Sequence, residues 1–351
     1  MSGAATTTDS PLAGAQRTAW RFEGFVTAVA VDAEARTAAF ALGSGRVRLV
    51  DFARQQAHAA RTAAPHQGAA LALVADEAGG FVTGGDDGRV MRLTCDGETT
   101  ELARFAGQWV EHVASLGAHG VAAAVGRAVH VIHDGATRAL GPHASTVAGV
   151  ARLDGRLAVA HYNGVSLWDL DAAPDTEAYA TPDRLEWKGS HLAVAPSPDG
   201  RFVATATQDH ALHAWRLENR SEMQMAGYPS KAVSLTWSAD SLLLGASGAN
   251  NLSAWPFDGD GPEGREPAIF FDAKEALATR VAFHPRLRLI AGGFNDGTLA
   301  VVDIERRRAI KIPVSKGVAV SALAWSHDGR HVVAGAEDGR AAILTLEGAA
   351  T

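Results

Sequence analysis

The chain has 351 residues, 47% of them hydrophobic and 20% charged, and its 39 acidic and 32 basic side chains give a formal net charge of −7. Disordered chains are richer in charge and poorer in apolar residues, and a disulfide scaffold cannot be built from the single cysteine, Cys95, so both classes are excluded. The mild acidity argues against a nucleic-acid partner, because such proteins need a basic surface that displaces counterions from phosphates.

Residues 1–14 at the N-terminus are small and polar and include a proline, which predicts a flexible tail. This segment has neither the basic nor the apolar region of a secretory signal, and no stretch of the chain has 18 consecutive apolar residues. We therefore expect a cytoplasmic protein without a membrane partner. Arginine outnumbers lysine 27 to 5, a bias typical of GC-rich bacterial genomes.

A short pattern recurs along the chain: an apolar strand, a turn, a second strand, a tight turn and a third strand. It is clearest around 81–94, 202–217, 290–304 and 332–346. Asp-Gly or Asn-Gly between two alternating segments is the strongest short hairpin signal, because a type I′ turn needs positive φ at both central residues. The predicted tight turns are Asp87-Gly88, Asn163-Gly164, Asp296-Gly297 and Asp338-Gly339, with Asp209-His210 and Asn250-Asn251 in the equivalent place.

The spacing of the third strands predicts the architecture. A marker residue on that strand recurs at a mean interval of 42 residues, and four strands in about 40–45 residues is the period of a propeller blade. Eight markers predict an all-β propeller of eight four-stranded blades. Seven blades is the alternative, since the unit at 113–134 is the most degenerate. The markers are Val50, Leu93, His133, Trp168, Trp215, Trp255, Val302 and Leu344.

The two ends of the repeat array complement each other. The last unit ends near Leu346 without a fourth strand, whereas 16–22 forms a plausible strand ahead of the first unit. We expect this N-terminal strand to complete the C-terminal blade, which would hide both edges. The predicted organisation is a single propeller over 15–347, between the tail 1–14 and a short tail 348–351. A closed ring needs no second copy to cover its edges, so we expect a monomer.

These features resemble the WD-repeat β-propeller family. Trp168-Asp169 is the signature dipeptide of that family, and Val50-Asp51, His133-Asp134 and Val302-Asp303 are partial forms of it. The turn Ser197-Pro198-Asp199-Gly200 is similar to the turn between the first and second strands of the family's repeat. The resemblance covers about residues 15–346, and eight copies in phase carry more weight than any one dipeptide.

The resemblance implies a structural hydrogen-bond network inside each blade, made by a loop histidine, a Ser or Thr on the second strand, an Asp at the tight turn and a Trp on the third strand. In the fifth unit the histidine is missing, since we place His191 within the first strand. His143 is roughly placed for the fourth unit. The residues expected to have this structural role are Thr83, Asp87, Asn163, Trp168, Thr205, Asp209, Trp215, Asp296 and Asp338.

The sequence contains no P-loop, HExxH, CxxC or GxSxG motif, so we predict neither an enzyme nor a cofactor. The 14 histidines raise metal binding as an alternative. The pairs His130 with His133 and His210 with His213 are three residues apart, a spacing that points side chains to opposite faces of a strand. A site assembled from different blades stays open. The alternative function is therefore a propeller that handles a small molecule or metal, and the resemblance implies that it could be accessory to a GTP-dependent metallochaperone.

The connections between blades carry aromatic and charged side chains and should form one rim of the propeller. Such residues are typical of binding hot spots, although the aromatic rings could instead pack between blades. We therefore predict a non-enzymatic scaffold that binds a protein or peptide on this rim. The predicted rim residues are Phe25, Trp109, Trp187, Lys188, Tyr228, Lys231 and Lys274.

Overall fold

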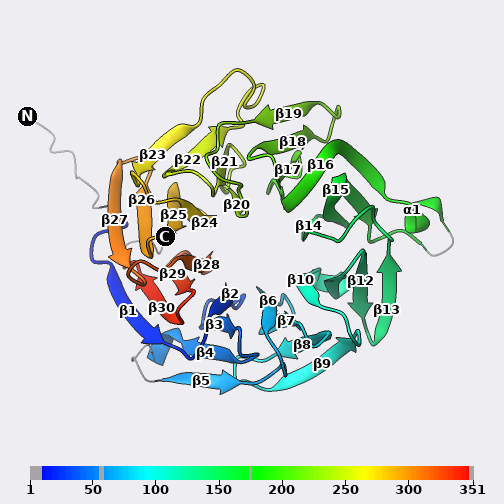
Figure 1. Cartoon of the computed structure of the whole chain (residues 1–351), viewed down its shortest axis with the longest axis horizontal. Coiled ribbons are helices and arrows are strands. Elements are labelled where there is room, and N and C mark those ends of the chain that lie inside the picture. Colours follow the sequence, from blue (N-terminus) through cyan, green and yellow to red (C-terminus); the bar gives the residue numbers. More distant parts are fainter. Residues whose placement is uncertain (1–9, 55–58, 174–175, 348–351) are drawn as a thin grey trace, which may run out of the picture.

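Short antiparallel strands joined by turns account for most of the computed structural model, which describes residues 10–54, 59–173 and 176–347. The sheets stand side by side around a central opening, and the strands nearest to it are β2, β6, β10, β14, β20, β24 and β28 (Figure 1). In the described part of the chain the only helical segments are α1 (Glu177–Ala180), η1 (Phe52–Arg54) and η2 (Gly117–His119). None of these described helices is long and apolar enough to cross a membrane.

Three four-stranded sheets form the first part of the ring, in an up-and-down order that follows the chain. They are β2 (Val26–Val31), β3 (Thr37–Leu42), β4 (Val47–Asp51) and β5 (Ala60–Ala63); β6 (Ala70–Ala75), β7 (Phe81–Gly85), β8 (Arg89–Leu93) and β9 (Thr99–Arg104); and β10 (Val110–Ser115), β11 (Val121–Val125), β12 (Ala128–His133) and β13 (Ala136–Leu140).

Three further four-stranded sheets form the last part of the ring. They are β20 (Leu235–Trp237), β21 (Leu243–Ala246), β22 (Asn251–Pro256) and β23 (Ala268–Asp272); β24 (Ala278–Phe283), β25 (Leu289–Phe294), β26 (Thr298–Asp303) and β27 (Arg308–Pro313); and β28 (Val320–Trp325), β29 (His331–Ala336) and β30 (Arg340–Thr345) with β1 (Gln16–Arg21).

One wider sheet lies between these two groups. It contains β14 (Gly149–Leu153), β15 (Arg156–Asp169), β16 (Asp183–Pro196), β17 (Phe202–Thr207), β18 (Leu212–Arg216) and β19 (Glu222–Met225). β15 turns back on itself at Asn163 and Gly164, so that the Leu170 N–H donates to the Gly155 carbonyl at 2.9 Å. β16 pairs with β15 through its first half and with β17 through its second half.

The expectation of eight separate four-stranded blades is therefore wrong. Within the described residues, hydrogen bonding joins the strands into seven sheets, which gives the alternative number of seven blades when each sheet is counted as one. The physical reason lies in β16. Backbone pairing continues along this strand where the repeat pattern predicts a connection between two units, so two consecutive sequence repeats share one sheet.

The ring closes as the sequence predicts. β1 pairs with β30 in antiparallel register from Gln16↔Thr345 to Arg21↔Arg340 and forms the outer strand of the last sheet. Ahead of β1, the Ser10 hydroxyl donates to Asp303 Oδ2 at 3.0 Å, and Leu12 is buried. Residues 1–9 of the predicted N-terminal tail and the predicted tail 348–351 lie outside the described residues.

The core lies between neighbouring sheets rather than inside any one of them. Every residue of the second strands β3, β25 and β29 is buried, because both faces of these strands are covered by the adjacent sheets. Small residues let the sheets approach closely. At Gly293 in β25, an added Cβ would collide with the Val320 side chain of the next sheet. The alanine and glycine of these strands thus reflect the close packing of sheet against sheet.

Hydroxyl groups near the start of several innermost strands tie one sheet to the next. The Ser321 hydroxyl donates to the Val26 carbonyl at 2.5 Å, which bonds the last sheet to the first. The Thr27 hydroxyl donates to the Ala70 carbonyl at 2.6 Å, and the Thr279 hydroxyl donates to the Val320 carbonyl at 2.6 Å. These bonds run across the sheet boundaries, where strand pairing is absent, and hold the inner wall of the ring together.

Candidate functional site

The connections between sheets and the tight hairpin turns lie on the same rim. The Phe105 N–H donates to the Gly88 carbonyl at 2.7 Å, and the Phe22 N–H donates to the Gly339 carbonyl at 2.8 Å. Both glycines have positive φ, and a Cβ on either would collide with a carbonyl oxygen of the same connection. The Asp-Gly pairs therefore serve two purposes: they permit the turn, and they leave space for the rim connection that crosses it.

A pocket of about 280 Å³ opens on this rim where β20, β24 and β28 begin. Figure 1 shows that these strands lie beside the central opening. We call this pocket the axial pocket. Phe25 and Val233, which are 40% and 44% exposed, both line it although Phe25 precedes β2 and Val233 precedes β20. The other lining residues used below are Lys231, Thr279, Arg280 and Glu337.

The two basic side chains of the axial pocket, Arg280 and Lys231, form no ion pair within the described chain. The Arg280 guanidinium donates from Nη1 to the Thr279 carbonyl at 2.8 Å, and no carboxylate of the described residues forms an ion pair with it. Burial lowers the pKa of Arg280 below its ordinary value, although the negative charge of Glu337 acts to raise it. Lys231 is exposed at the same pocket. An apolar surface therefore lies beside a partly desolvated cation.

A second depression on the rim, of about 540 Å³, lies over the wide sheet and is lined by Tyr162, Asn163, Glu186, Trp187, Lys188 and Glu222. Trp187 stacks on His213, with ring centres 4.0 Å apart and planes 21° apart. Trp187 and Lys188 belong to β16 and not to a free loop. One face of the Trp187 ring is thus packed on His213, while the residue also lines the depression at the surface.

The structure brings together some of the predicted rim residues and separates others. Phe25 meets Lys231 in the axial pocket, and Trp187 meets Lys188 over the wide sheet. Trp109 is 61% exposed in the connection between β9 and β10. Tyr228 is half-buried, and its hydroxyl accepts a hydrogen bond from Trp255 Nε1 at 2.9 Å, while burial raises its pKa.

The remaining predicted rim residue, Lys274, is exposed in a left-handed turn. Neither Trp109, Tyr228 nor Lys274 lines the two depressions. Sequence reasoning missed Val233, which lies two residues before β20, and Arg280, which lies in β24. Their position in the repeat was the signal that could have identified them. Residues at the point where a connection leads into an innermost strand lie close to the central opening.

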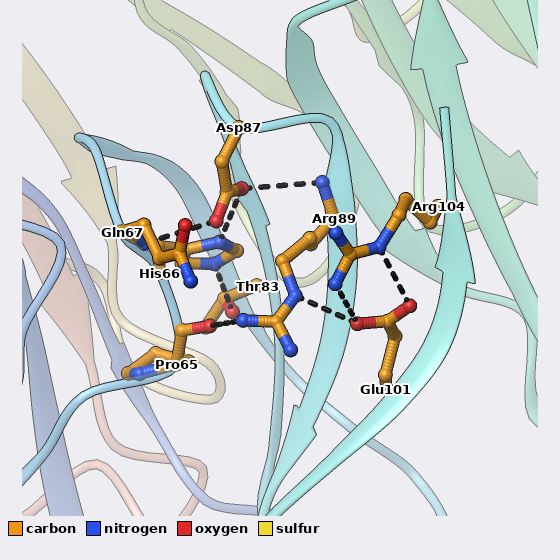
Figure 2. A network of polar contacts seen from close by, with 8 residues as sticks. All are labelled: Pro65, His66, Gln67, Thr83, Asp87, Arg89, Glu101 and Arg104. Carbon is orange, nitrogen blue, oxygen red and sulfur yellow. Dashed lines mark hydrogen bonds and ion pairs between the residues drawn. The ribbon is translucent and has the colours of Figure 1, made fainter. Parts of the chain in front are cut away.

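One blade holds a nearly complete version of the expected network (Figure 2). His66 Nε2 lies 2.7 Å from Thr83 Oγ1, and His66 Nδ1 lies 3.0 Å from Asp87 Oδ1. The Gln67 N–H donates to Asp87 Oδ2 at 3.0 Å. Burial lowers the pKa of His66 despite the neighbouring carboxylate, so the neutral ring accepts from the Thr83 hydroxyl and donates to Asp87. Thr83 and Asp87 thus both contact His66, a histidine that the sequence analysis does not include.

An ion-pair chain continues from this network to the outer strands (Figure 2). Arg89 donates from Nη1 to the Pro65 carbonyl at 3.2 Å and from Nε to Glu101 Oε2 at 2.7 Å. Glu101 also accepts from Arg104 at 2.8 Å. Hydrogen bonds from Arg104 and Arg89 lower the pKa of Glu101 to about 2. This chain fixes the third and fourth strands of the blade relative to the rim connection.

The fourth repeat has a different form of this network. His143 Nε2 accepts from Trp168 Nε1 at 3.1 Å, and burial lowers the pKa of His143 to about 4, so the ring is neutral. Asn163 lies in the exposed turn of β15 at a φ of 72° and makes no contact with this pair. The network of the fourth repeat thus contains the hydrogen bond between His143 and Trp168 but not the turn residue Asn163.

In the fifth repeat the expected absence of a histidine is wrong. His191 lies within β16 as predicted, yet its Nδ1 reaches Thr205 Oγ1 at 2.9 Å from there. Asp209 is exposed, and Trp215 Nε1 has no hydrogen-bond partner among the described residues.

The two last predicted aspartates cap turns. Asp296 Oδ1 accepts from the Thr298 N–H at 2.9 Å, and Asp338 Oδ2 accepts from the Ser315 hydroxyl at 2.8 Å. As for metals, no group of three His, Cys, Asp or Glu side chains in the parts of the chain that the structure describes is arranged to hold an ion.

Comparisons with known proteins agree with this architecture. A family model described as the WD domain, G-beta repeat, matches residues 188–216, and a model of the WD40 domain of anaphase-promoting complex subunit 4 matches residues 281–351. No curated protein matches the chain. Among solved structures, the computationally designed Ika8 protein is similar in fold, with a TM-score of 0.71 at 18% identity, over 94% of this chain and all of that one.

Proposed function

Because the chain belongs to the WD-repeat β-propeller family, as its sequence predicts, we propose that it is a non-enzymatic scaffold that binds a protein or peptide on the rim formed by its inter-sheet connections. The fold by itself suggests an interaction protein only in general terms, since unrelated functions occur on one fold. The specific proposal depends on the rim. We further propose that the protein acts in the cytoplasm as a monomeric ring.

The observation that carries the proposal is the meeting of Phe25 and Val233 in the axial pocket. Burial of a large apolar side chain is favourable by about 1.5–3 kcal/mol, so exposing two of them at one place is costly unless a ligand covers them. Both residues belong to connections that hydrogen bonds hold in position: the Phe25 carbonyl accepts from the Gly43 N–H at 2.9 Å, and the Val233 N–H donates to the Ser247 hydroxyl at 3.0 Å. Exposed apolar surface on a rigid frame is typical of a binding site.

The test compares three forms of the full-length protein as bait in extracts of its native cells, with quantitative mass spectrometry of the captured proteins. The first is the unchanged protein, and the second is the double variant Phe25→Ser/Val233→Ser. The third is Ile269→Ser, a matched control on the outer strand β23, where an apolar residue is also exposed but lies outside the pocket. We expect one or more proteins captured by the unchanged form and by the control, and lost from the double variant.

Identical sets of captured proteins from all three baits would overturn the proposal for this rim. Circular dichroism and thermal unfolding of each form show whether the fold is kept. Since both substituted residues are already exposed, we expect the melting temperature of the double variant to stay within about 2 °C of the unchanged protein.

A further inference from the structure

Arg280 is the one feature of the axial pocket that apolar contact alone does not explain. A guanidinium has five N–H donors, and only one hydrogen bond is formed by that of Arg280 among the described residues, from Nη1 to the Thr279 carbonyl. Taking a charge out of water is costly unless an opposite charge or several hydrogen bonds compensate it. Arg280 is half-buried and has no such ion pair in the described chain.

The surroundings of Arg280 favour an anion that carries an apolar neighbour. Lys231 adds a second positive charge to the wall, and Glu337 is the single carboxylate among the described lining residues. Phe25 and Val233 supply the exposed apolar surface beside these charges. A guanidinium pairs with a carboxylate through two parallel hydrogen bonds, which is a geometry that lysine cannot offer.

We propose that the axial pocket binds a partner peptide through an Asp or Glu side chain that pairs with Arg280, while an adjacent apolar side chain of the peptide packs on Phe25 and Val233. This inference rests on the proposed function, because it names the chemistry of the partner that the rim binds. A nucleic acid is disfavoured as the anion. The net charge of −7 repels a polyanion, and a pocket of about 280 Å³ holds one or two side chains rather than a backbone.

The experiment uses the full-length protein and a displayed library of random twelve-residue peptides as the probe. Selected peptides are synthesised, and their dissociation constants are measured by fluorescence anisotropy. We expect the selected sequences to share an Asp or Glu next to a large apolar residue. Arg280→Gln should weaken their binding at least about tenfold, because a hydrogen-bonded charge pair is lost, and Arg280→Lys should restore part of the affinity. Glu337→Gln removes the opposing carboxylate and should strengthen binding.

Two controls make the outcome specific. Arg17→Gln removes an exposed arginine on the outer strand β1, outside the pocket, and should leave the dissociation constant unchanged. Replacing the peptide's acidic residue by its amide should weaken binding to the unchanged protein, yet cause no further loss with Arg280→Gln. This non-additivity is the signature of a direct pair.

The possible failures are distinguishable. If selected peptides lose affinity for Phe25→Ser/Val233→Ser but bind Arg280→Gln as tightly as the unchanged protein, the acidic contact is refuted and the proposed function stands. If no peptide is selected, or if all selected peptides bind the double variant equally well, the pocket is not a peptide site and both proposals fall. Selection of peptides rich in Lys and Arg would likewise overturn the assignment of an acidic partner.

Discussion

His213 should make the protein lose stability as the pH falls below neutrality. Its side chain is 1% exposed and stacks on Trp187, and neither ring nitrogen has a hydrogen-bond partner among the described residues. Burial, together with the nearby His191, lowers the pKa of His213 to about 4 from an ordinary value of 6.5. A folded molecule therefore keeps this ring neutral over a range of pH in which an unfolded chain would protonate it.

The sign and size follow from proton linkage. Between pH 6.5 and 4 the unfolded chain binds the proton and the folded protein does not, so stability contributed by His213 is present above pH 6.5 and is lost as the pH falls toward 4. Relative to pH 7.5, the loss at pH 5.0 amounts to about 2 kcal/mol for this one group. That is a large fraction of the stability of a typical folded protein.

The substitution His213→Leu tests this argument. Removal of two unsatisfied nitrogens should raise the free energy of unfolding at pH 7.5 by about 1 kcal/mol. The variant should also lose about 2 kcal/mol less than the unchanged protein between pH 7.5 and pH 5.0. Urea titrations followed by tryptophan fluorescence at both pH values measure the two quantities, and His327→Gln, at an exposed turn, serves as the control. Equal losses for His213→Leu and the unchanged protein would refute the reasoning.

Three further predictions concern stability and are measured by thermal or urea unfolding. Gly88→Ala should lower the free energy of unfolding by about 2 kcal/mol more than Gly107→Ala does. Both glycines have a similar positive φ, but only at Gly88 would an added Cβ collide with a carbonyl oxygen. Equal losses would show that the backbone conformation, and not the collision, determines the effect. Thr83→Val should lower stability by about 1–3 kcal/mol by leaving the buried His66 Nε2 without a partner, whereas Thr83→Ser should restore most of it. Ser321→Ala should cost about 1 kcal/mol by removing the bond to the Val26 carbonyl, and an unchanged melting temperature would contradict that role for the hydroxyl.

The sequence predicts the ring because its signals are local and repeated. Asp-Gly turns between apolar strands specify hairpins without reference to the rest of the chain, and the closing strand follows from an unpaired segment at each end. The number of sheets could not be predicted in this way. Whether β16 bends or breaks near Lys188 and Gly189 depends on how β15 and β17 pair with its two halves, and the residues of β16 alone do not reveal this.

Some residues of the candidate site could likewise be predicted from the sequence, and others could not. Phe25 and Lys231 were identified by residue type, since aromatic and charged residues in a connection stand out in a sequence. Arg280 was not, because it lies within the strand β24, and neither was Val233, a common apolar residue just ahead of β20. Both contribute to a site only together with residues that other repeats bring to the same pocket. His66 was missed for a related reason. Its partners Thr83 and Asp87 were recognisable, but the histidine lies in a connection with no fixed spacing from them.

The pairing of β1 with β30 has a consequence for how the molecule is made. These strands are adjacent in space but are separated by almost the whole described sequence, so a chain emerging from the ribosome exposes β1 until translation has nearly finished. Six sheets can form from contiguous segments during that time, whereas the last must wait for a strand synthesised long before. A circular permutant that moves Gln16–Arg21 behind β30 would convert this slow, distant pairing into a hairpin, and it should refold faster while keeping the same ring.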